Sequence, residues 1–166
     1  AKLGEGRFLV AEADESDGSF LKLSPVISVV TNVDPEHMDY FKTRDALMEA
    51  FTDFIDAIPF YGLAVLCMDC DNLRDIMGRV EKRVVTYGTC HQADFRAESI
   101  KTEGLKSRFR VLHHGKELGE ITVPAPGLHN VLNALASIVV GLEVEIPFNK
   151  IADGLTSYQG IGRRFQ

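Results

Sequence analysis

Two clusters of acidic side chains are the first residues in this sequence that could do chemistry. The first cluster consists of Glu12, Asp14, Glu15 and Asp17. The second cluster adds an imidazole and consists of Asp34, Glu36, His37 and Asp39. Carboxylates that lie close together repel one another and raise one another's pKa, so each cluster favours a bound cation. Hard oxygen ligands with one imidazole suit Mg²⁺ or Mn²⁺ better than zinc. The alternative is a pair of solvated acidic loops, which are common on protein surfaces.

The position of these clusters favours a site. Each cluster lies at the carboxyl end of an apolar run, residues 7–13 in the first case and residues 26–33 in the second. In open parallel sheets, ligands bind outside the carboxyl ends of the strands. We therefore expect Glu12 and Asn32 to lie nearest the edge of a sheet.

A third candidate is a glycine followed by histidine and two asparagines near the start of an expected helix, at Gly127, His129, Asn130 and Asn133. Residues three apart share one face of a helix, and two amides on one face can recognise a flat heterocycle through paired donors and acceptors. The alternative is a simple loop in which Asn130 caps the helix.

The sequence contains three cysteines, an odd number that argues against a disulfide framework and favours a reducing, cytosolic environment. Cys67 and Cys70 form a C-x-x-C pattern, and Cys90 is followed by a histidine. Zinc needs four ligands within tetrahedral reach. Because the pair follows an apolar run, we expect it to pack as small thiols rather than to bind metal.

The elements that must position these residues follow from the apolar pattern. Nearly continuous apolar runs predict strands that are buried on both faces of a parallel sheet, over residues 7–13, 26–33, 62–68 and 83–87. Helical spacing predicts helices over residues 44–58 and 72–78, the first capped by Thr43. The fold class is therefore α/β, with a mostly parallel sheet flanked by helices.

The pattern changes after Gly88. Short alternating strands over residues 94–100, 107–113 and 118–123 predict a small antiparallel sheet. Two further helices are expected, over residues 130–142 and 148–158.

Length and composition fit one folded domain. The chain has 166 residues, of which 45% are hydrophobic and 25% are charged. With 18 basic and 24 acidic residues its net charge is −6, which argues against nucleic acid and anionic membranes as partners. No apolar run approaches the roughly 18 residues of a membrane span.

Four stretches taken together resemble the Mur ligase family. They are residues 12–20 (EADESDGSF), 31–39 (TNVDPEHMD), 127–134 (GLHNVLNA) and 160–165 (GIGRRF). They occur in the family's order and spacing, and the similarity spans nearly the whole chain. The resemblance implies the P-loop-type central, ATP-binding domain of a cytoplasmic enzyme of peptidoglycan synthesis.

The resemblance also implies a reaction. These ligases use ATP to convert a substrate carboxylate to an acyl phosphate, which an amine attacks through a tetrahedral intermediate. The first stretch is typical of the branch that joins L-alanine to UDP-N-acetylmuramate, and of the relatives that recycle murein tripeptide. The expected partners are thus UDP-N-acetylmuramate, L-alanine and ATP. The alternatives are a murein-tripeptide ligase and a non-catalytic α/β domain that binds a divalent ion.

The resemblance assigns roles to residues. Glu12 resembles the glutamate that holds Mg²⁺ (or Mn²⁺) between the ATP phosphates, and His37 the histidine near a second metal and the reacting carboxylate. These two are the expected catalytic and metal-binding residues. The expected ATP-binding residues are His129, Asn130, Asn133 and Arg164. The expected substrate-binding residues are Asp14, Glu15 and Ser16.

The sequence departs from the family in two respects. Many relatives carry a carbamylated lysine on the helix after the histidine-containing loop, but no lysine occurs between Lys42 and Lys82 in this sequence. The phosphate loop G-x-x-G-K-[ST] does not occur in it, and we expect this loop upstream of Ala1. We therefore expect residues 1–166 to be a partial central domain, without the uridine-binding N-terminal and the C-terminal domains. Such a fragment is expected to be inactive and to self-associate through its incomplete sheet.

Overall fold

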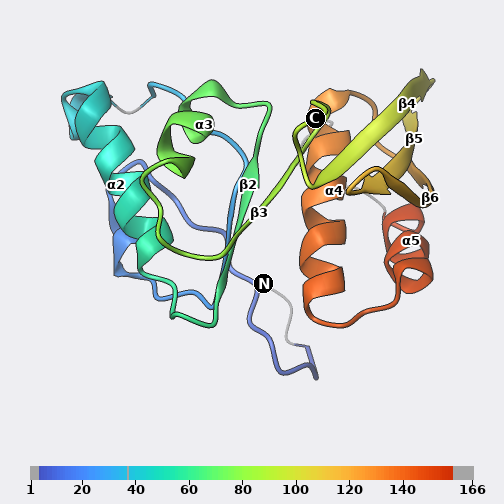
Figure 1. Ribbon diagram of the computed structural model, residues 1–166, viewed down its shortest axis with the longest axis horizontal. Helices are drawn as coiled ribbons and strands as arrows, with labels where there is room; N and C mark the ends of the chain where they lie inside the picture. Colours follow the sequence, from blue (N-terminus) through green and yellow to red (C-terminus); the bar gives the residue numbers. More distant parts are fainter. Residues whose placement is uncertain (1–3, 37, 159–166) are drawn as a thin grey trace.

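The structure, a computed structural model, describes residues 4–36 and 38–158. Six strands form one mixed sheet in the order β1-β2-β3-β4-β5-β6 (Figure 1). The strands are β1 (Ile27–Val30), β2 (Leu63–Cys67), β3 (Val84–Gly88), β4 (Phe95–Glu103), β5 (Lys106–His113) and β6 (Lys116–Val123). The helices are the 3-10 turn η1 (Ser19–Lys22) and α1 (Met38–Phe41), α2 (Arg44–Asp56), α3 (Asp71–Met77), α4 (Leu128–Glu143) and α5 (Phe148–Thr156).

The first half of the sheet is parallel, as the apolar runs predict, since β1, β2, β3 and β4 pair in parallel. Every residue of β2 is buried, which explains its unbroken apolar sequence. The apolar stripe of α2 includes Leu47, Phe51 and Ile55 in the core. Thr43 caps this helix as predicted, because its Oγ1 accepts a hydrogen bond of 3.2 Å from the backbone N–H of Ala46.

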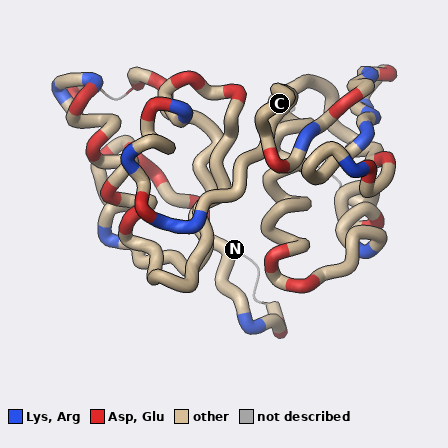
Figure 2. The backbone as a smooth tube through the Cα atoms, viewed as in Figure 1, with Lys and Arg blue, Asp and Glu red and all other residues tan. Residues whose placement is uncertain are grey.

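The second half is an antiparallel meander, as expected, but it continues the parallel sheet instead of forming a separate one. Along β5, Phe109 and Val111 face the core while arginines alternate with them. Arg108 lies 3.7 Å from carboxylate oxygens of both Glu103 and Glu120. Figure 2 shows these alternating charges along the strands, which keep one face of the meander in solvent.

The two halves meet at a short junction between β3 and β4. Only Tyr87 with Phe95 and Gly88 with Arg96 are in register there. Beside this short ladder, the carboxylate of Asp94 accepts hydrogen bonds of 2.8 Å from both the backbone N–H and the hydroxyl of Thr86. Helix α4 packs against strands of both halves and so covers the junction.

The prediction of a strand over residues 7–13 is wrong. This segment has no regular secondary structure, and Leu9 and Val10 are each 92% exposed. Figure 1 shows the chain after the N-terminus as a loop at the bottom of the view, away from the sheet. An apolar run becomes a strand only where a neighbouring strand satisfies its backbone, and among the described residues none pairs with this one.

The other predicted helices and strands agree with the observed ones to within a few residues, whereas the short elements η1 and α1 were not predicted. The strand expected over residues 26–33 is shorter than expected, because β1 covers only Ile27–Val30. In the described part of the chain, no helix is long and apolar enough to cross a membrane.

Candidate functional site

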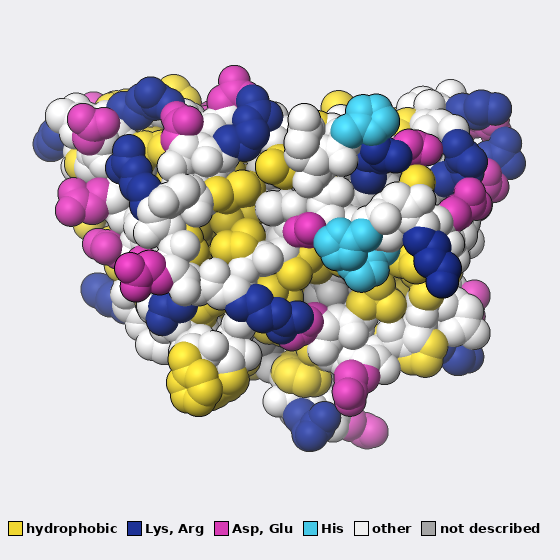
Figure 3. All heavy atoms as spheres, viewed as in Figure 1, with side chains coloured by type: hydrophobic (Ala, Val, Ile, Leu, Met, Phe, Trp, Pro, Cys, Tyr) yellow, Lys and Arg dark blue, Asp and Glu magenta, His cyan; other side chains and the backbone are white. Residues whose placement is uncertain are grey.

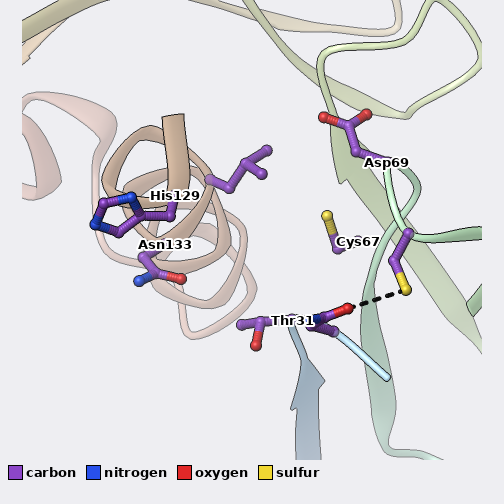
Figure 4. A pocket seen from close by; sticks show the side chains of 8 residues that line it. Thr31, Cys67, Asp69, His129 and Asn133 are labelled. Carbon is purple, nitrogen blue, oxygen red and sulfur yellow. Dashed lines mark hydrogen bonds between the residues drawn. The ribbon is translucent and has the colours of Figure 1, made fainter. Parts of the chain in front are cut away.

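A cavity of about 380 Å³ lies where the carboxyl ends of β1 and β2 face the first turns of α4. Its lining residues are Thr31, Asn32, Cys67, Asp69, Cys70, His129, Leu132 and Asn133. Figure 3 shows hydrophobic side chains gathered near the middle of one face of the molecule, between its two halves. Figure 4 shows His129 and Asn133 on one side of the cavity and Cys67 and Asp69 on the other. We call this cavity the edge pocket.

One wall of the edge pocket is the chain that leaves β1. The thiol of Cys70 donates a hydrogen bond to Oδ1 of Asn32 over 3.3 Å, drawn as a dashed line in Figure 4. The side-chain amide of Asn72 donates to the backbone carbonyl of Val33 over 2.6 Å and holds this loop against α3. The prediction that Asn32 lies at the edge of the sheet is therefore confirmed.

A second wall of the edge pocket is the chain that follows β2, and Asp69 holds it in place. Its carboxylate accepts hydrogen bonds from the backbone N–H and the hydroxyl of Thr89, each over 2.9 Å, and from the N–H of Cys90 over 3.3 Å. A Cβ at Gly88 would collide with this carboxylate, so glycine leaves the space that Asp69 fills. These contacts tie the ends of β2 and β3 together beside the pocket.

The third wall is the start of α4. Gly127 has a φ of 101°, a backbone conformation that favours glycine, and a Cβ on it would lie only 3.0 Å from the imidazole of His129. Asn133 and Leu132, one turn further, also line the pocket.

Asn130 behaves differently from its neighbours. Its side-chain amide donates to the backbone carbonyl of Pro126 over 2.7 Å, and it does not line the edge pocket. The N-cap of α4 is Gly127, so the alternative in which Asn130 caps the helix is wrong. The structure brings His129 and Asn133, but not Asn130, to the cavity.

The acidic residues of the first cluster line a different cavity. Glu12, Ala13, Asp14 and Glu15 border an open hollow of about 460 Å³, which we call the acidic hollow. Glu12 does not follow a strand, contrary to the expectation that it would lie at the edge of a sheet. A carboxylate oxygen of Asp14 accepts a hydrogen bond of 2.9 Å from the backbone N–H of Ser16 and shapes the loop.

The loop continues with a second turn of the same kind. Asp17 accepts a hydrogen bond of 2.9 Å from the backbone N–H of Ser19, and hydrogen bonding by Ser19 lowers the pKa of that carboxyl.

His37 and Arg164 lie outside the described residues, so the convergence of Glu12 and His37 remains a prediction. Among the described residues no three metal-binding side chains are grouped closely enough to hold an ion.

Reasoning from the sequence missed several pocket residues, namely Thr31, Cys67, Asp69, Cys70 and Leu132. The prediction that the thiols pack inside is confirmed for Cys67, which is 2% exposed and whose pKa is raised mainly by burial. Cys70 is half-buried and contributes to the pocket wall. Applying the rule for carboxyl ends of strands to the run over residues 62–68 would have indicated both Asp69 and Cys70.

Comparison of the sequence with known proteins identifies its relatives. Residues 3–141 match the model of the Mur ligase middle domain. The chain is 57% identical over 166 residues to a UDP-N-acetylmuramate–L-alanine ligase of Desulfatibacillum aliphaticivorans and 54% identical over 165 residues to one of Geobacter sp. (strain M21). The alignments cover 100% and 99% of this chain but only 36% of each relative, so the chain spans about a third of their length.

Solved structures share the fold. The MurC ligase of Thermotoga maritima superposes with a TM-score of 0.78 at 24% identity, over 92% of this chain and 34% of the other. A MurF structure from Acinetobacter baumannii gives a TM-score of 0.77 at 21% identity, over 91% of this chain and 33% of the other. At these identities the similarity establishes the α/β architecture.

Proposed function

Because this chain belongs to the Mur ligase family, we propose that it provides the nucleotide-binding part of an ATP-dependent ligase that joins L-alanine to UDP-N-acetylmuramate. The high identity to ligases of that name, over the full length of the chain, supports this branch of the family. As the chain spans about a third of those relatives, most of the binding of the uridine-linked substrate and of the amino acid is assigned to the remaining parts of such a ligase.

The observation that carries the proposal is the edge pocket. It lies at the carboxyl ends of parallel strands, where open α/β sheets bind ligands, and its volume suits a small ligand. Leu132 offers an apolar surface to a heterocyclic base, and the amide of Asn133 offers both a donor and an acceptor to its edge. His129 would complete the adenine site, while Asn130 would act on it only indirectly, by holding the Pro126 turn.

The acidic hollow is the proposed place of the divalent ion. Glu12 borders this hollow and offers a carboxylate oxygen, a hard donor that suits Mg²⁺ or Mn²⁺. A bound ion supplies positive charge to the ATP phosphates in a protein of net charge −6. Glu12 is proposed to hold that ion with His37, and Arg164 to contact the nucleotide. Asp14, Glu15 and Ser16 are proposed to border the path of the uridine-linked substrate.

ATP binding to the isolated chain tests the pocket. Titration with ATP, followed by amide NMR, should shift the signals of Thr31, Asn32 and Asn133. Affinity should be low, because the sequence lacks the phosphate loop that cradles the β- and γ-phosphates. Asn133→Ala should weaken binding by about fivefold, the value of one hydrogen bond of about 1 kcal/mol.

The matched control is Asn149→Ala, which removes an exposed amide from α5, outside the pocket lining. It should leave the affinity unchanged. Signals that shift around the β5–β6 hairpin instead of the edge pocket would contradict the assignment.

Turnover tests the proposed reaction. The isolated chain should release no phosphate from ATP in the presence of UDP-N-acetylmuramate, L-alanine and Mg²⁺. In a longer ligase that contains this chain, Glu12→Ala should lower turnover roughly 10²–10³-fold, as expected for loss of a preorganised electrostatic group. Glu5→Ala, which removes an exposed carboxylate of the same segment that does not line the hollow, is the control.

His37→Ala should also lower turnover of the longer ligase. Metal binding requires a neutral imidazole, so the contribution of His37 should fade as the pH falls towards about 6.5. Wild-type turnover in both variants would refute the metal assignment. Turnover with murein tripeptide but not with L-alanine would assign the chain to the recycling branch instead.

The free edge of β1 is the proposed surface for self-association. Among the described residues no strand pairs with the outer side of β1, and Val26 and Val29 are 49% and 39% exposed. An unpaired edge with apolar side chains is a template for pairing with another chain. Light scattering over a concentration series should show oligomers, and Val29→Lys should reduce them. A strictly monomeric chain at high concentration would contradict this.

A further inference from the structure

Two thiols lie at the ends of one tight turn in the wall of the edge pocket. Residues 68 and 69 form a turn that follows β2, closed by a hydrogen bond of 3.4 Å from the backbone N–H of Cys70 to the carbonyl of Cys67. The Cα atoms at the ends of such a β-turn lie less than about 7 Å apart. Disulfides join Cα atoms about 4.4–6.8 Å apart, a range that overlaps the Cα separation of such a turn.

Both sulfur-bearing residues contribute to the same cavity. Cys70 is half-buried, and its thiol donates to Asn32 across the pocket wall. Cys67 is buried at the end of β2. A peroxide that enters the pocket therefore reaches the thiol of Cys70 first, with a second thiol one turn away to complete the reaction.

We propose that Cys67 and Cys70 form an oxidisable dithiol, a modification site in the wall of the edge pocket that peroxides convert to an intramolecular disulfide. The thiolate of Cys70 attacks the peroxide, an S–O bond forms as the O–O bond breaks, and the leaving oxygen departs as water or alcohol. The sulfur of Cys67 then displaces water from this sulfenic acid as the S–S bond forms. The two thiols lose a pair of electrons, and the peroxide gains them.

The order of the two steps follows from burial. Burial is the main cause that raises the pKa of the Cys67 thiol, so little of it is present as the reactive thiolate. Cys67 is thus suited to the second, intramolecular step, in which its proximity compensates for its low ionisation.

The disulfide would alter the pocket itself. Once the sulfur of Cys70 is bonded to Cys67, it can no longer donate a hydrogen to Asn32, and that amide must find another partner. An effect on nucleotide binding depends on the proposed function, whereas the oxidation chemistry does not.

Peptide mapping tests the site on the intact 166-residue chain. After treatment with hydrogen peroxide and alkylation of the remaining thiols, trypsin releases Cys67 and Cys70 together in the peptide of residues 45–74 and Cys90 in the peptide of residues 84–96. The main product should be peptide 45–74 lacking a pair of hydrogens and both alkyl groups. Dithiothreitol should restore the reduced peptide.

Two variants complete the test. Cys70→Ser retains a hydrogen-bond donor for Asn32 and should abolish the disulfide, whereas Cys90→Ser should form it at an unchanged rate. A cross-link between the two peptides, a disulfide between two chains, or oxidation of Cys70 to sulfinic acid as the main product would overturn the proposal. In the wild-type chain, the side-chain amide signal of Asn32 should shift on oxidation, and an unchanged signal would also count against the proposal.

Discussion

Two apolar runs of similar composition adopt different structures in this protein, one a buried strand and the other an exposed segment. Residues 63–67 form β2, in which every side chain is buried between α-helices and neighbouring strands. Residues 7–13 are exposed throughout and form no strand, although they also combine leucine, valine and alanine. The difference lies in their neighbours, since β2 is hydrogen-bonded to β1 on one side and to β3 on the other.

This comparison shows what an apolar sequence can and cannot specify. Apolar character supplies the free energy of burial, but a strand also needs partners for its N–H and C=O groups on the flanking strands. The functional consequence is direct. Asp69, which follows β2, is held in place by Thr89, whereas Glu12, near the end of the exposed run, has no regular secondary structure around it.

The largest expected effect is on stability and tests the comparison in its simplest form. Leu66→Ala removes a side chain that is fully buried in β2 and should lower the free energy of unfolding by about 2–5 kcal/mol. Leu9→Ala changes a residue that is 92% exposed and should alter it by less than about 0.5 kcal/mol. Urea unfolding of the isolated chain measures both, and equal losses would mean that residues 7–13 are packed in solution.

A smaller effect on stability is expected when the carboxylates that follow the two apolar runs are removed. Asp69→Ala removes the acceptor for the backbone N–H and the hydroxyl of Thr89 and should cost about 1–3 kcal/mol of unfolding free energy. Asp14→Ala changes an exposed turn and should cost clearly less. Thermal unfolding of the two variants would show the contrast, and an equal cost would indicate that the acidic loop is as firmly held as the edge pocket.

The smallest effect is a pH dependence that contrasts two adjacent histidines. The ring of His113 stacks on Phe95 with centroids 4.1 Å apart, and burial, followed by the charge of His114, lowers its pKa. The unfolded chain, with a histidine pKa of about 6.5, therefore binds this proton more readily than the folded one. Stability should be constant above about pH 6.5 and should decline as the pH falls below it.

His113→Gln should reduce that decline, whereas His114→Gln, at an exposed position, should do so much less. Urea midpoints of the wild-type chain and of both variants, measured between pH 5 and pH 8, give the answer. An unchanged slope in the His113 variant would show that this imidazole is as solvated as its neighbour.

Much of the fold could be predicted from the sequence, because local signals are strong where elements pack on one another. Helix α2 begins after its predicted cap, Thr43, and has the expected apolar stripe. Strand β1 forms within the β-branched run that predicted it. The site was harder to predict. Asn133 and His129, which the sequence analysis expects to bind ATP, line the edge pocket. The contact of Asn130 depends on a carbonyl of Pro126 that no spacing rule reveals. The fixed position of Asp69 likewise depends on Thr89, which lies on another strand.

The reversal of strand direction after β4 also bears on the order in which the chain folds. β4, β5 and β6 are joined by two tight connections, so each pairs with the strand that precedes it in sequence. β1 and β2 are separated by α1 and α2 and must close a long loop before they pair. Contacts between residues near in sequence form faster than distant ones. The meander should thus be the earliest structured region during refolding, and the edge pocket, which requires β1, β2 and α4 together, should be completed among the last.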